Sequence, residues 1–195
     1  MELLKGFRGD LHWIHEREGH VGRPYYPGGE SGVTLDPGVD LGYFEKTILV
    51  GAYDKILSAE QMNYILSDVC GARGTVAVGL IEKADPRLVG IRISREQALA
   101  VFPHVAEPYW YKLVLVFKGL DKEDTPACVH TAVLSLGYNR GPANAGLRVL
   151  ADPIKDKEWK AVGKAIGGMQ QDHALKGIRD RRRLEGKLIL DGLSA

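Results

Sequence analysis

The sequence predicts an α+β fold, because a turn-rich segment near the N-terminus contrasts with a long remainder of helical patterning. Residues 21–43 are rich in glycine and proline, which favours turns and short strands over helix. After residue 45 the apolar residues recur at helical spacing almost throughout, apart from the ambiguous segment 71–92. The chain has 195 residues and is 45% apolar, enough for one core or two small lobes. We therefore expect a small N-terminal β-containing lobe and a larger helical lobe, with a cleft between them.

A regular apolar stripe predicts the first helix over residues 2–17, with Gly19 as its stop. One further helical step along the stripe reaches Glu18, so we expect this carboxylate at the end of a buried helix face. Glu16 lies two positions earlier, about 200° around the helix, and is expected to face solvent. The stripe consists of Leu4, Phe7, Leu11 and Ile14.

Short local signals mark the ends of the other elements. In "YYPGGESGVTL" we expect a hairpin with its turn at Gly28-Gly29. Two serine–glutamine pairs have the spacing of a capping box, in which each side chain bonds the other residue's free backbone amide. Proline near a helix start and paired glycines near a helix end predict further boundaries, before a last helix over roughly residues 175–190. These signals are Ser58–Gln61, Ser94–Gln97, Thr125-Pro126, Asp152-Pro153 and Gly167-Gly168.

Composition and charge exclude several classes of protein. The formal net charge is +1 and 26% of residues are charged, which predicts neither disorder nor a nucleic-acid-binding field over the whole protein. The N-terminus lacks a signal-peptide pattern, and the longest apolar run, residues 113–117, is too short to cross a bilayer. A soluble protein is expected. Cys70 and Cys128 form no disulfide framework or metal-ligand spacing, and small buried residues are the simpler interpretation.

The motif "HEREGH" resembles a zinc site but lacks the required spacing. A zinc-binding helix of the H-E-x-x-H type needs histidines at i and i+4, on one helix face. Here His15 and His20 stand at i and i+5, and the better-spaced pair of His12 and His15 has no third ligand nearby. We therefore expect no metal and no organic cofactor, with the histidines solvated or capping.

The acidic residues of this region suggest a different chemistry. Glycoside hydrolysis needs one protonated carboxylic acid and one ionised carboxylate on opposite sides of the scissile bond. An apolar environment, which the helix stripe predicts around Glu18, favours the protonated form of a carboxyl group. Asp36 and Asp40 lie in the turn-rich segment, where a carboxylate can stay ionised. Carboxylates beside glycine-rich turns are also common as plain surface groups, and spacing alone leaves that alternative open.

The stretch "EGHVGRPYYPGGESGVTLDPGVDLGY" resembles the catalytic segment of phage-type lysozymes, the endolysins or muramidases. Those enzymes carry a Glu-Gly after the first helix, then a tyrosine, a threonine and a glycine-containing turn. The matching residues here are Glu18-Gly19, Tyr25, Thr34 and Gly38.

The aspartate distinguishes two branches of that family. Lysozymes of the T-even phages place it between the glutamate and the threonine, where this chain has Pro27-Gly28 and no acid. The lysozyme domain of pesticin-like bacteriocins resembles the chain more closely, with its aspartate six residues after the threonine. Asp40 follows Thr34 by six residues, so the resemblance assigns it this role, with Asp36 and Glu30 as alternates.

The resemblance continues to about residue 190. "ISREQALAVF" resembles the helix that opens the family's second lobe, "AVLSLGYNRGPANAGL" a following helix and turn, and "GIRDRRRLEGKLI" the closing helix. Residues 68–92 have no counterpart and look like an insertion. The matching residues are Tyr138, Asn139 and Gly141, and then Arg181, Arg182 and Glu185.

The resemblance implies a single lysozyme-like catalytic domain over 1–195, with residues 1–56 as the helix and β lobe and 57–195 as the helical lobe. It implies a bacteriolytic glycoside hydrolase that cleaves the β-1,4 bond between N-acetylmuramic acid and N-acetylglucosamine in peptidoglycan, with inversion. The carboxyl groups are then expected about 6.5–9.5 Å apart. Glu18 is the implied general acid, Asp40 and Thr34 handle the water, and Arg181, or alternatively Arg179, pairs with Glu18. The implied substrate-binding residues are Tyr25, Gly38, Tyr138 and Asn139.

Several expectations about partners and setting accompany this one. The enzyme is expected to be a monomer that acts on peptidoglycan glycan strands, held in the host or producer cytoplasm before release to the cell wall in the periplasm. Residues 176–187 are rich in Lys and Arg, either as a solvated helix face or as a weak contact with anionic membranes. The alternatives to a muramidase are a lytic transglycosylase, a chitosan- or chitin-cleaving relative, and a non-enzymatic peptidoglycan-binding domain.

Overall fold

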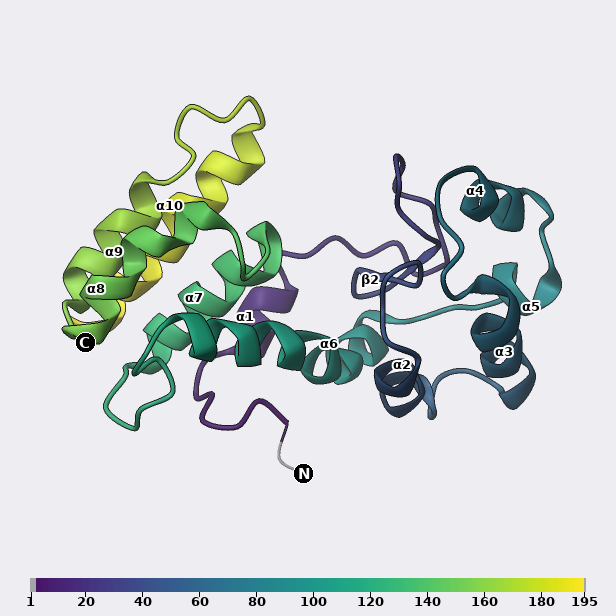
Figure 1. Cartoon of the computed structure of the whole chain (residues 1–195), viewed down its shortest axis with the longest axis horizontal. Helices are drawn as coiled ribbons and strands as arrows, with labels where there is room; N and C mark the ends of the chain where they lie inside the picture. The colour runs from purple at the N-terminus through teal and green to yellow at the C-terminus, as the bar shows by residue number, and fades with distance from the viewer. Residues whose placement is uncertain (1–2, 195) are drawn as a thin grey trace. The chain divides into compact units, whose positions relative to one another are not determined.

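The computed structural model describes residues 3–194, which form two compact units (Figure 1). The central unit is His15–Val105, and the terminal unit combines Met1–Ile14 with Ala106–Ala195. The long helix α6 (Arg95–Val116) begins in the central unit and ends in the terminal one. Helices dominate and a small antiparallel sheet lies in the central unit, which confirms the α+β class. The boundary expected between residues 56 and 57 falls inside the central unit, where residues 57–105 pack with the β region.

The sheet of the central unit consists of β1 (Thr34–Leu35) and β2 (Val39–Asp40). Thr34 lies opposite Asp40 and Leu35 opposite Val39, and the connecting turn is closed by Gly38 N–H donating to Leu35 O at 2.9 Å. Gly38 has a φ of +90°, a conformation that glycine adopts without strain. The regular hairpin therefore turns at residues 36–38. The turn expected at Gly28-Gly29 lies instead at the tip of a loop, which closes with a single bridge between Tyr25 and Thr34.

The rest of the central unit is mainly helical. Both expected capping boxes are confirmed: Gln61 N–H donates to Ser58 Oγ and Gln97 N–H to Ser94 Oγ, each at 3.2 Å. The helical elements are α2 (Lys46–Tyr53), α3 (Ala59–Tyr64), the π-helical turn η1 (Ile65–Val69), α4 (Gly74–Glu82), α5 (Pro86–Val89) and the first part of α6. The core that they enclose includes Val33, Leu35, Leu41, Leu49, Tyr53, Ile65, Leu88 and Phe102.

The ambiguous segment 71–92 is built into this unit. It contains α4 and α5, and its beginning runs beside the β region. Gly71 N–H donates to Leu41 O and Gly74 N–H to Ser31 O, both at 3.0 Å. A bridge between Gly32 and Arg73 lies between these two bonds. The start of the segment therefore pairs with the β region and extends the small sheet.

Helices α7, α9 and α10 form the body of the terminal unit, and α9 packs closely along α10 (Figure 1). Glycine permits this approach, because a Cβ on Gly186 would lie 2.5 Å from Gly163 O. The predicted start of α7 after Pro126, the end of α9 at Gly168 and the last helix are confirmed. The start predicted at Asp152-Pro153 lies one residue late, since α8 follows directly from the 3-10 turn η2. The elements are α7 (Ala127–Arg140), η2 (Ala145–Leu150), α8 (Ala151–Lys155), α9 (Trp159–Gly168) and α10 (Lys176–Gly192).

The helix expected over residues 2–17 is wrong in extent, and residue 2 lies outside the described part of the chain. Helix α1 covers only Leu11–His15. Upstream of it, the backbone amides bond to α7 instead of to their own preceding turn. Arg8 N–H donates to His130 Nδ1 at 2.9 Å, and Asp10 N–H donates to Thr131 Oγ1 at 2.8 Å. The Asp10 carboxylate then accepts Trp13 N–H at 2.9 Å, as an N-cap does, and so fixes where the helix begins.

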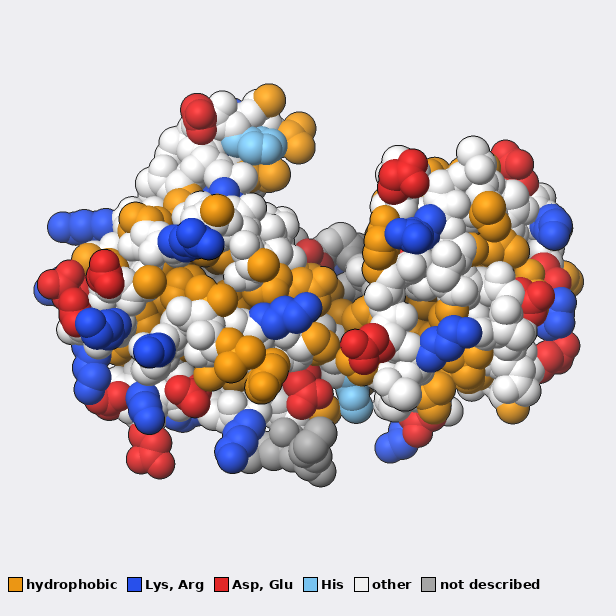
Figure 2. Space-filling view, viewed as in Figure 1, with side chains coloured by type: hydrophobic (Ala, Val, Ile, Leu, Met, Phe, Trp, Pro, Cys, Tyr) orange, Lys and Arg blue, Asp and Glu red, His pale blue; other side chains and the backbone are white. Residues whose placement is uncertain are grey.

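The surfaces of both units carry mixed charge. On the face drawn in Figure 2, basic and acidic side chains are interspersed over each unit rather than gathered by sign. Within α10 the cations Lys176, Arg183 and Lys187 lie against nearby aspartates of the same helix. Among residues 3–194 there is no helix with the length and apolar character needed to cross a membrane. The membrane contact considered for residues 176–187 stays a prediction.

The buried His130 links stability of the terminal unit to pH. Its Nδ1 accepts the Arg8 amide and its Nε2 donates to Leu120 O at 2.7 Å, while the ring lies against Phe7 and Trp110. Burial lowers the pKa of His130 to about 4, so the folded state holds the neutral imidazole. Unfolding restores a pKa near 6.5, and the unfolded chain binds the extra proton. Stability is therefore present above pH 6.5 and is lost progressively as the pH falls towards 4.

We expect His130→Gln to flatten this part of the pH profile. The free energy of unfolding, measured by urea titration between pH 4 and 7.5, should fall with acid more steeply in the wild type than in the variant. His104→Gln, at a half-buried histidine without a bond to a described residue, is the control and should keep the wild-type slope. Equal slopes for the wild type and His130→Gln would contradict the assignment.

Candidate functional site

Three of the residues expected at the site lie side by side in the small sheet of the central unit. Tyr25 and Thr34 exchange backbone hydrogen bonds of 3.1 and 2.8 Å, and Thr34 is the direct partner of Asp40 on its other side. Directly opposed residues of antiparallel strands point to the same face, with Cβ atoms about 4.5–5.5 Å apart. Tyr25, Thr34 and Asp40 therefore form one row across this face, which we call the Tyr25–Thr34–Asp40 row.

Glu18 lies in the electrostatic neighbourhood of this row. The pKa of Tyr25 is raised, first by burial and then by the negative charges of Asp36, Asp40 and Glu18. Glu18 thus contributes the third and smallest of the three carboxylate charges that act on this phenol. Four expected site residues, Glu18 and the row, therefore belong to the central unit.

The local setting of Glu18 differs from the one expected. Helix α1 ends at His15, and Glu18 follows in a bend whose backbone N–H donates to His15 O at 3.0 Å. The expectation of a carboxylate on a buried helical stripe is therefore wrong, and Glu18 is half-buried in a loop. The expectation that Glu16 faces solvent is confirmed.

Asp40 is oriented by two backbone amides. Gly32 N–H and Gly42 N–H both donate to its Oδ1 atom at 2.8 Å. Oδ2 has no hydrogen-bond partner among residues 3–194, and the side chain is half-buried. One carboxylate oxygen therefore fixes the side chain, and the other is left available for a water or a substrate hydroxyl.

The two glycines that hold Asp40 have no room for a side chain. A Cβ on Gly32 would lie 2.3 Å from Gly42 N and 2.6 Å from Asp40 Oδ1. A Cβ on Gly42 would lie 2.6 Å from Arg73 Cγ. Glycine at both positions is what lets three backbone segments converge on this carboxylate.

Asp36, the first alternate candidate, is buried and hydrogen-bonded to the loop after α1. Its side chain is 1% exposed and accepts the backbone N–H groups of Val21, at 3.0 Å, and of Gly22. His20 Nδ1 lies 3.3 Å from the same carboxylate. Its backbone oxygen accepts the hydroxyl of Tyr53 at 2.6 Å, and burial raises the pKa of that tyrosine. Asp36 therefore ties the loop after α1 to the sheet, with no oxygen turned towards solvent.

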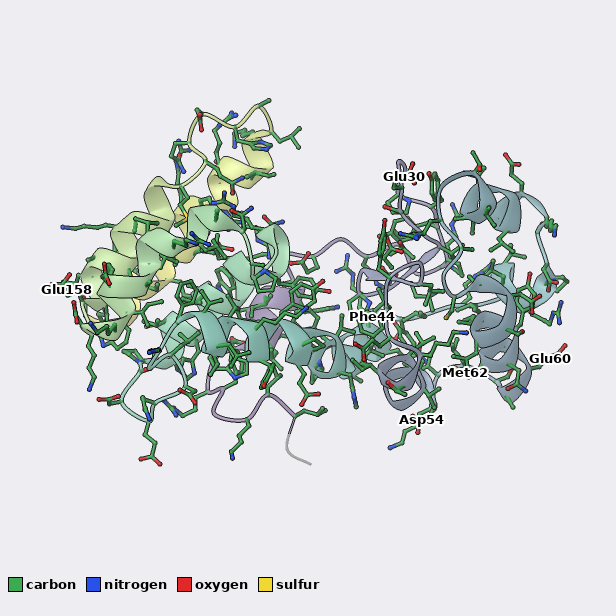
Figure 3. All side chains as sticks on the ribbon, viewed as in Figure 1. Glu30, Phe44, Asp54, Glu60, Met62 and Glu158 are labelled. Atoms are coloured by element: carbon green, nitrogen blue, oxygen red, sulfur yellow. The ribbon has the colours of Figure 1, made fainter. Side chains whose placement is uncertain are left out.

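The remaining candidates of the central unit lie at turns. Glu30, the second alternate, is exposed near the tip of the loop that joins Tyr25 to Thr34 (Figure 3), and its backbone oxygen accepts the Tyr43 hydroxyl at 3.1 Å. Gly38 is exposed in the β1–β2 turn.

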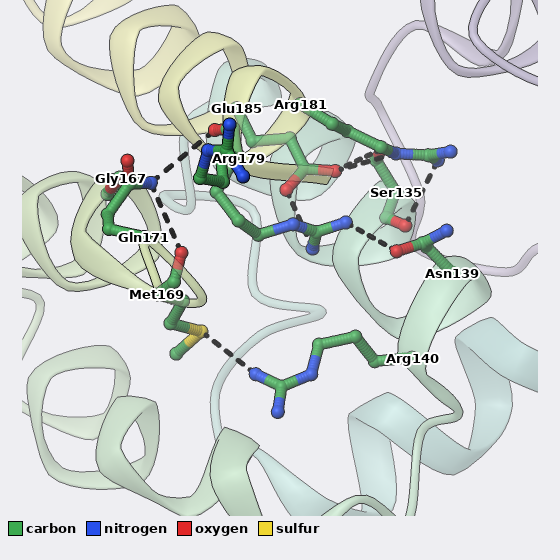
Figure 4. A network of polar contacts seen from close by, with 10 residues as sticks. Ser135, Asn139, Arg140, Gly167, Met169, Gln171, Arg179, Arg181 and Glu185 are labelled. Atoms are coloured by element: carbon green, nitrogen blue, oxygen red, sulfur yellow. Dashed lines mark hydrogen bonds and ion pairs between the residues drawn. The ribbon is translucent and has the colours of Figure 1, made fainter. Parts of the chain in front are cut away.

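The candidates of the terminal unit belong to α7 and α10. Tyr138 is half-buried against Tyr109, with ring centroids 4.8 Å apart, and Asn139 is exposed one residue further along α7. Asn139 Oδ1 accepts Arg182 Nη2 at 2.6 Å (Figure 4). Its amide nitrogen has no bond within the described chain, so the exposed end of this side chain is a hydrogen-bond donor.

The arginine that binds Asn139 belongs to a buried ion pair. Arg182 and Glu185 are both 0% exposed, and Arg182 Nη1 lies 2.9 Å from Glu185 Oε2. The other oxygen of Glu185 accepts Ser135 Oγ at 2.6 Å and Arg181 Nε at 3.2 Å (Figure 4). Burial raises the pKa of Glu185, and the arginines and Ser135 oppose that shift.

Arg181 is held by the same network. Its Nη2 donates to Ser135 Oγ at 3.0 Å, in addition to the bond from Nε to Glu185. Glu18 belongs to the central unit and Arg181 to the terminal one. Their pairing, the alternative through Arg179 and the cleft between two lobes all stay predictions.

Arg73 is a site neighbour that sequence reasoning missed. Its guanidinium lies over the ring of Tyr43, 4.8 Å from the centroid, and its backbone pairs with Gly32. The pKa of Arg73 is raised, chiefly by Tyr43 and in part by the charges of Glu30 and Asp40. Arg73 thus places a cation beside Asp40. No sequence signal indicated this, because it lies in the segment that looked like an insertion.

Comparisons with known proteins add no family assignment. Neither a scan against protein families nor a search of curated proteins finds a match to this chain. In residues 3–194 no three or more histidine, cysteine, aspartate or glutamate side chains are grouped so as to hold a metal ion. Cys70 and Cys128 are free and half-buried, and burial raises the pKa of both thiols.

We expect Gly32→Ala to disrupt the setting of Asp40. The added methyl group must displace Gly42 or the aspartate, which should lower the free energy of unfolding by roughly 1–3 kcal/mol. Gly51→Ala is the matched control, because Gly51 is exposed in α2 with nothing within 4 Å of its Cβ position. That change should be neutral or stabilising, by about 0.5–1 kcal/mol. Urea unfolding measures both, and an equally stable Gly32→Ala protein would contradict the steric argument.

Proposed function

We propose that the protein is a glycoside hydrolase that cleaves the β-1,4 bond between N-acetylmuramic acid and N-acetylglucosamine in peptidoglycan. The observation that carries the proposal is the Tyr25–Thr34–Asp40 row, which lies in the same unit as Glu18. Glycosidic hydrolysis requires a carboxylic acid and a carboxylate on either side of the scissile bond. The resemblance of residues 18–40 to the catalytic segment of phage-type lysozymes supports the same assignment.

Glu18 is assigned the role of general acid. It donates its proton to the glycosidic oxygen as the bond to the anomeric carbon breaks. Asp40 presents Oδ2 to a water molecule and accepts a proton from it as the water attacks the anomeric carbon. Thr34 lies between Tyr25 and Asp40, and its hydroxyl holds that water. Attack from the face opposite the leaving group inverts the anomeric configuration.

Asn139 and Tyr138 are assigned to substrate binding, with Tyr25 and Gly38. The free amide nitrogen of Asn139 is suited to an acceptor, and the carbonyl oxygen of an N-acetyl group is such an acceptor. Tyrosine rings offer flat apolar faces and a polar edge, which suits them to sugar rings.

Replacing the proposed acid tests the assignment directly. Glu18→Gln keeps the shape of the side chain but removes its acidic proton, so hydrolysis should fall by about 10²–10⁴-fold or more while the fold persists. The measurement is the release of reducing sugar ends from purified sacculi, with the ends identified by mass spectrometry. Glu16→Gln, at an exposed neighbour, is the control and should retain wild-type activity. A fully active Glu18→Gln protein would refute the proposal.

The nature of the products separates the alternatives. Reducing muramic acid ends indicate a muramidase, and anhydromuramic ends a transglycosylase. Cleavage of chitin or chitosan in preference to sacculi indicates the third class of enzyme. Sacculi that are bound without release of sugar ends indicate a binding domain.

Asp40→Asn should mainly lower activity, and Asp36→Asn should mainly lower stability. In Asp40→Asn the amide oxygen can still accept both glycine amides, so the fold should persist, while loss of the base should lower hydrolysis by about 10²-fold or more. In Asp36→Asn a buried charge-assisted cluster is lost, which should reduce the free energy of unfolding by roughly 2–4 kcal/mol. Hydrolysis of sacculi and urea unfolding are measured for both. Loss of activity in a stable Asp36→Asn protein, with Asp40→Asn active, would transfer the role to Asp36.

A further inference from the structure

A pocket of about 620 Å³ lies entirely within the central unit, next to the proposed site. One side comes from residues 23–26, and the other comes from residues 78–92 of the segment that extends the sheet. Tyr25 belongs both to this pocket and to the Tyr25–Thr34–Asp40 row. A ligand in the pocket is therefore in contact with a residue that also borders the proposed catalytic groups.

The polar lining of the pocket carries two cations and one anion. Arg23 is exposed and has neither a hydrogen bond nor an ion pair within the described chain. Arg92 is anchored by one nitrogen, Nη1, which donates to Val89 O at 2.6 Å and to Ile91 O at 2.7 Å. Its other guanidinium nitrogens have no bonded partner in the same part of the chain. Glu82, on α4, supplies the negative charge.

The apolar lining comes from the wall of residues 78–92, which also carries Glu82 and Arg92. Val78 and Ile81 lie on α4, and Val89 ends α5. A guanidinium offers paired donors that fit a carboxylate, and aliphatic side chains of this size fit small alkyl groups. The pocket thus combines sites for carboxylates, one site for an ammonium group and an aliphatic wall, and its volume is in the range of small-ligand sites.

We propose that this pocket binds the peptide stem of peptidoglycan, an inference that rests on the proposed function. The stem is a short peptide attached to the muramic acid sugar of the bond to be cleaved. It carries carboxylates for Arg23 and Arg92, alanine methyl groups for Val78, Ile81 and Val89, and, on its diamino acid, an ammonium group for Glu82. The shared residue Tyr25 gives the continuity between sugar and stem that such a substrate requires.

The decisive experiment measures binding without catalysis. The tripeptide L-alanyl-γ-D-glutamyl-meso-diaminopimelate is titrated into the full chain, and chemical-shift changes give its Kd. Arg23→Glu reverses an unbonded exposed charge and should weaken binding about tenfold or more. Arg92→Gln should weaken it in the same direction. Lys55→Glu, the same reversal at an exposed residue of this unit outside the pocket, should leave the Kd within about twofold.

The outcomes for pocket and proposed function are separable. If the wild type cleaves neither stem-bearing glycan nor glycan whose stems were removed, the proposed function fails, and peptide binding alone still decides the pocket. If it cleaves them, Arg23→Glu should slow hydrolysis of the stem-bearing glycan about tenfold and leave the stem-free rate within about twofold. Absence of peptide binding, equal slowing on both glycans, or binding of a glycerol-phosphate oligomer in place of the peptide would each overturn the inference.

Discussion

The buried carboxylate of Asp36 fixes the loop after α1 against the small sheet, and the arrangement of the proposed site depends on this contact. The loop supplies the amides of Val21 and Gly22, which Asp36 accepts, and carries Glu18 a few residues earlier. The contact therefore fixes the backbone that directly follows Glu18. The two aspartates of the segment thus differ in role. Asp36 stabilises the fold, whereas Asp40 keeps one carboxylate oxygen available.

Features that depend on local chemistry could be predicted from the sequence. Both capping boxes involve only residues three positions apart, so their signal is local. The first helix could not be predicted, because the amides of Arg8 and Asp10 bond to α7, more than a hundred residues away. Apolar spacing carries no information about such bonds, and a stripe over residues 4–14 therefore suggested one continuous helix.

The contribution of the segment 71–92 also lay beyond sequence reasoning. It lacks a strand pattern, and its pairing with the sheet needs only the backbone of residues 71–74. Through that pairing it brings Arg73 beside Asp40 and forms one wall of the pocket that contains Arg92. Residues 68–92 have no counterpart in the enzymes that the sequence resembles. Under the proposed function, we therefore expect this segment to act in substrate selection rather than in bond cleavage.

The Arg182–Glu185 pair shows a comparable division between stability and function in the terminal unit. Taking two charges out of water costs several kcal/mol per ion, and a buried pair is seldom more stabilising than apolar residues of the same volume. Its geometry gives a different reason for its presence. Arg182 engages the oxygen of Asn139, so the exposed amide can present only its nitrogen. Two apolar residues could fill the same space but could not fix that direction. Under the proposed function, the buried pair acts by orienting a donor towards the acceptor groups of the glycan.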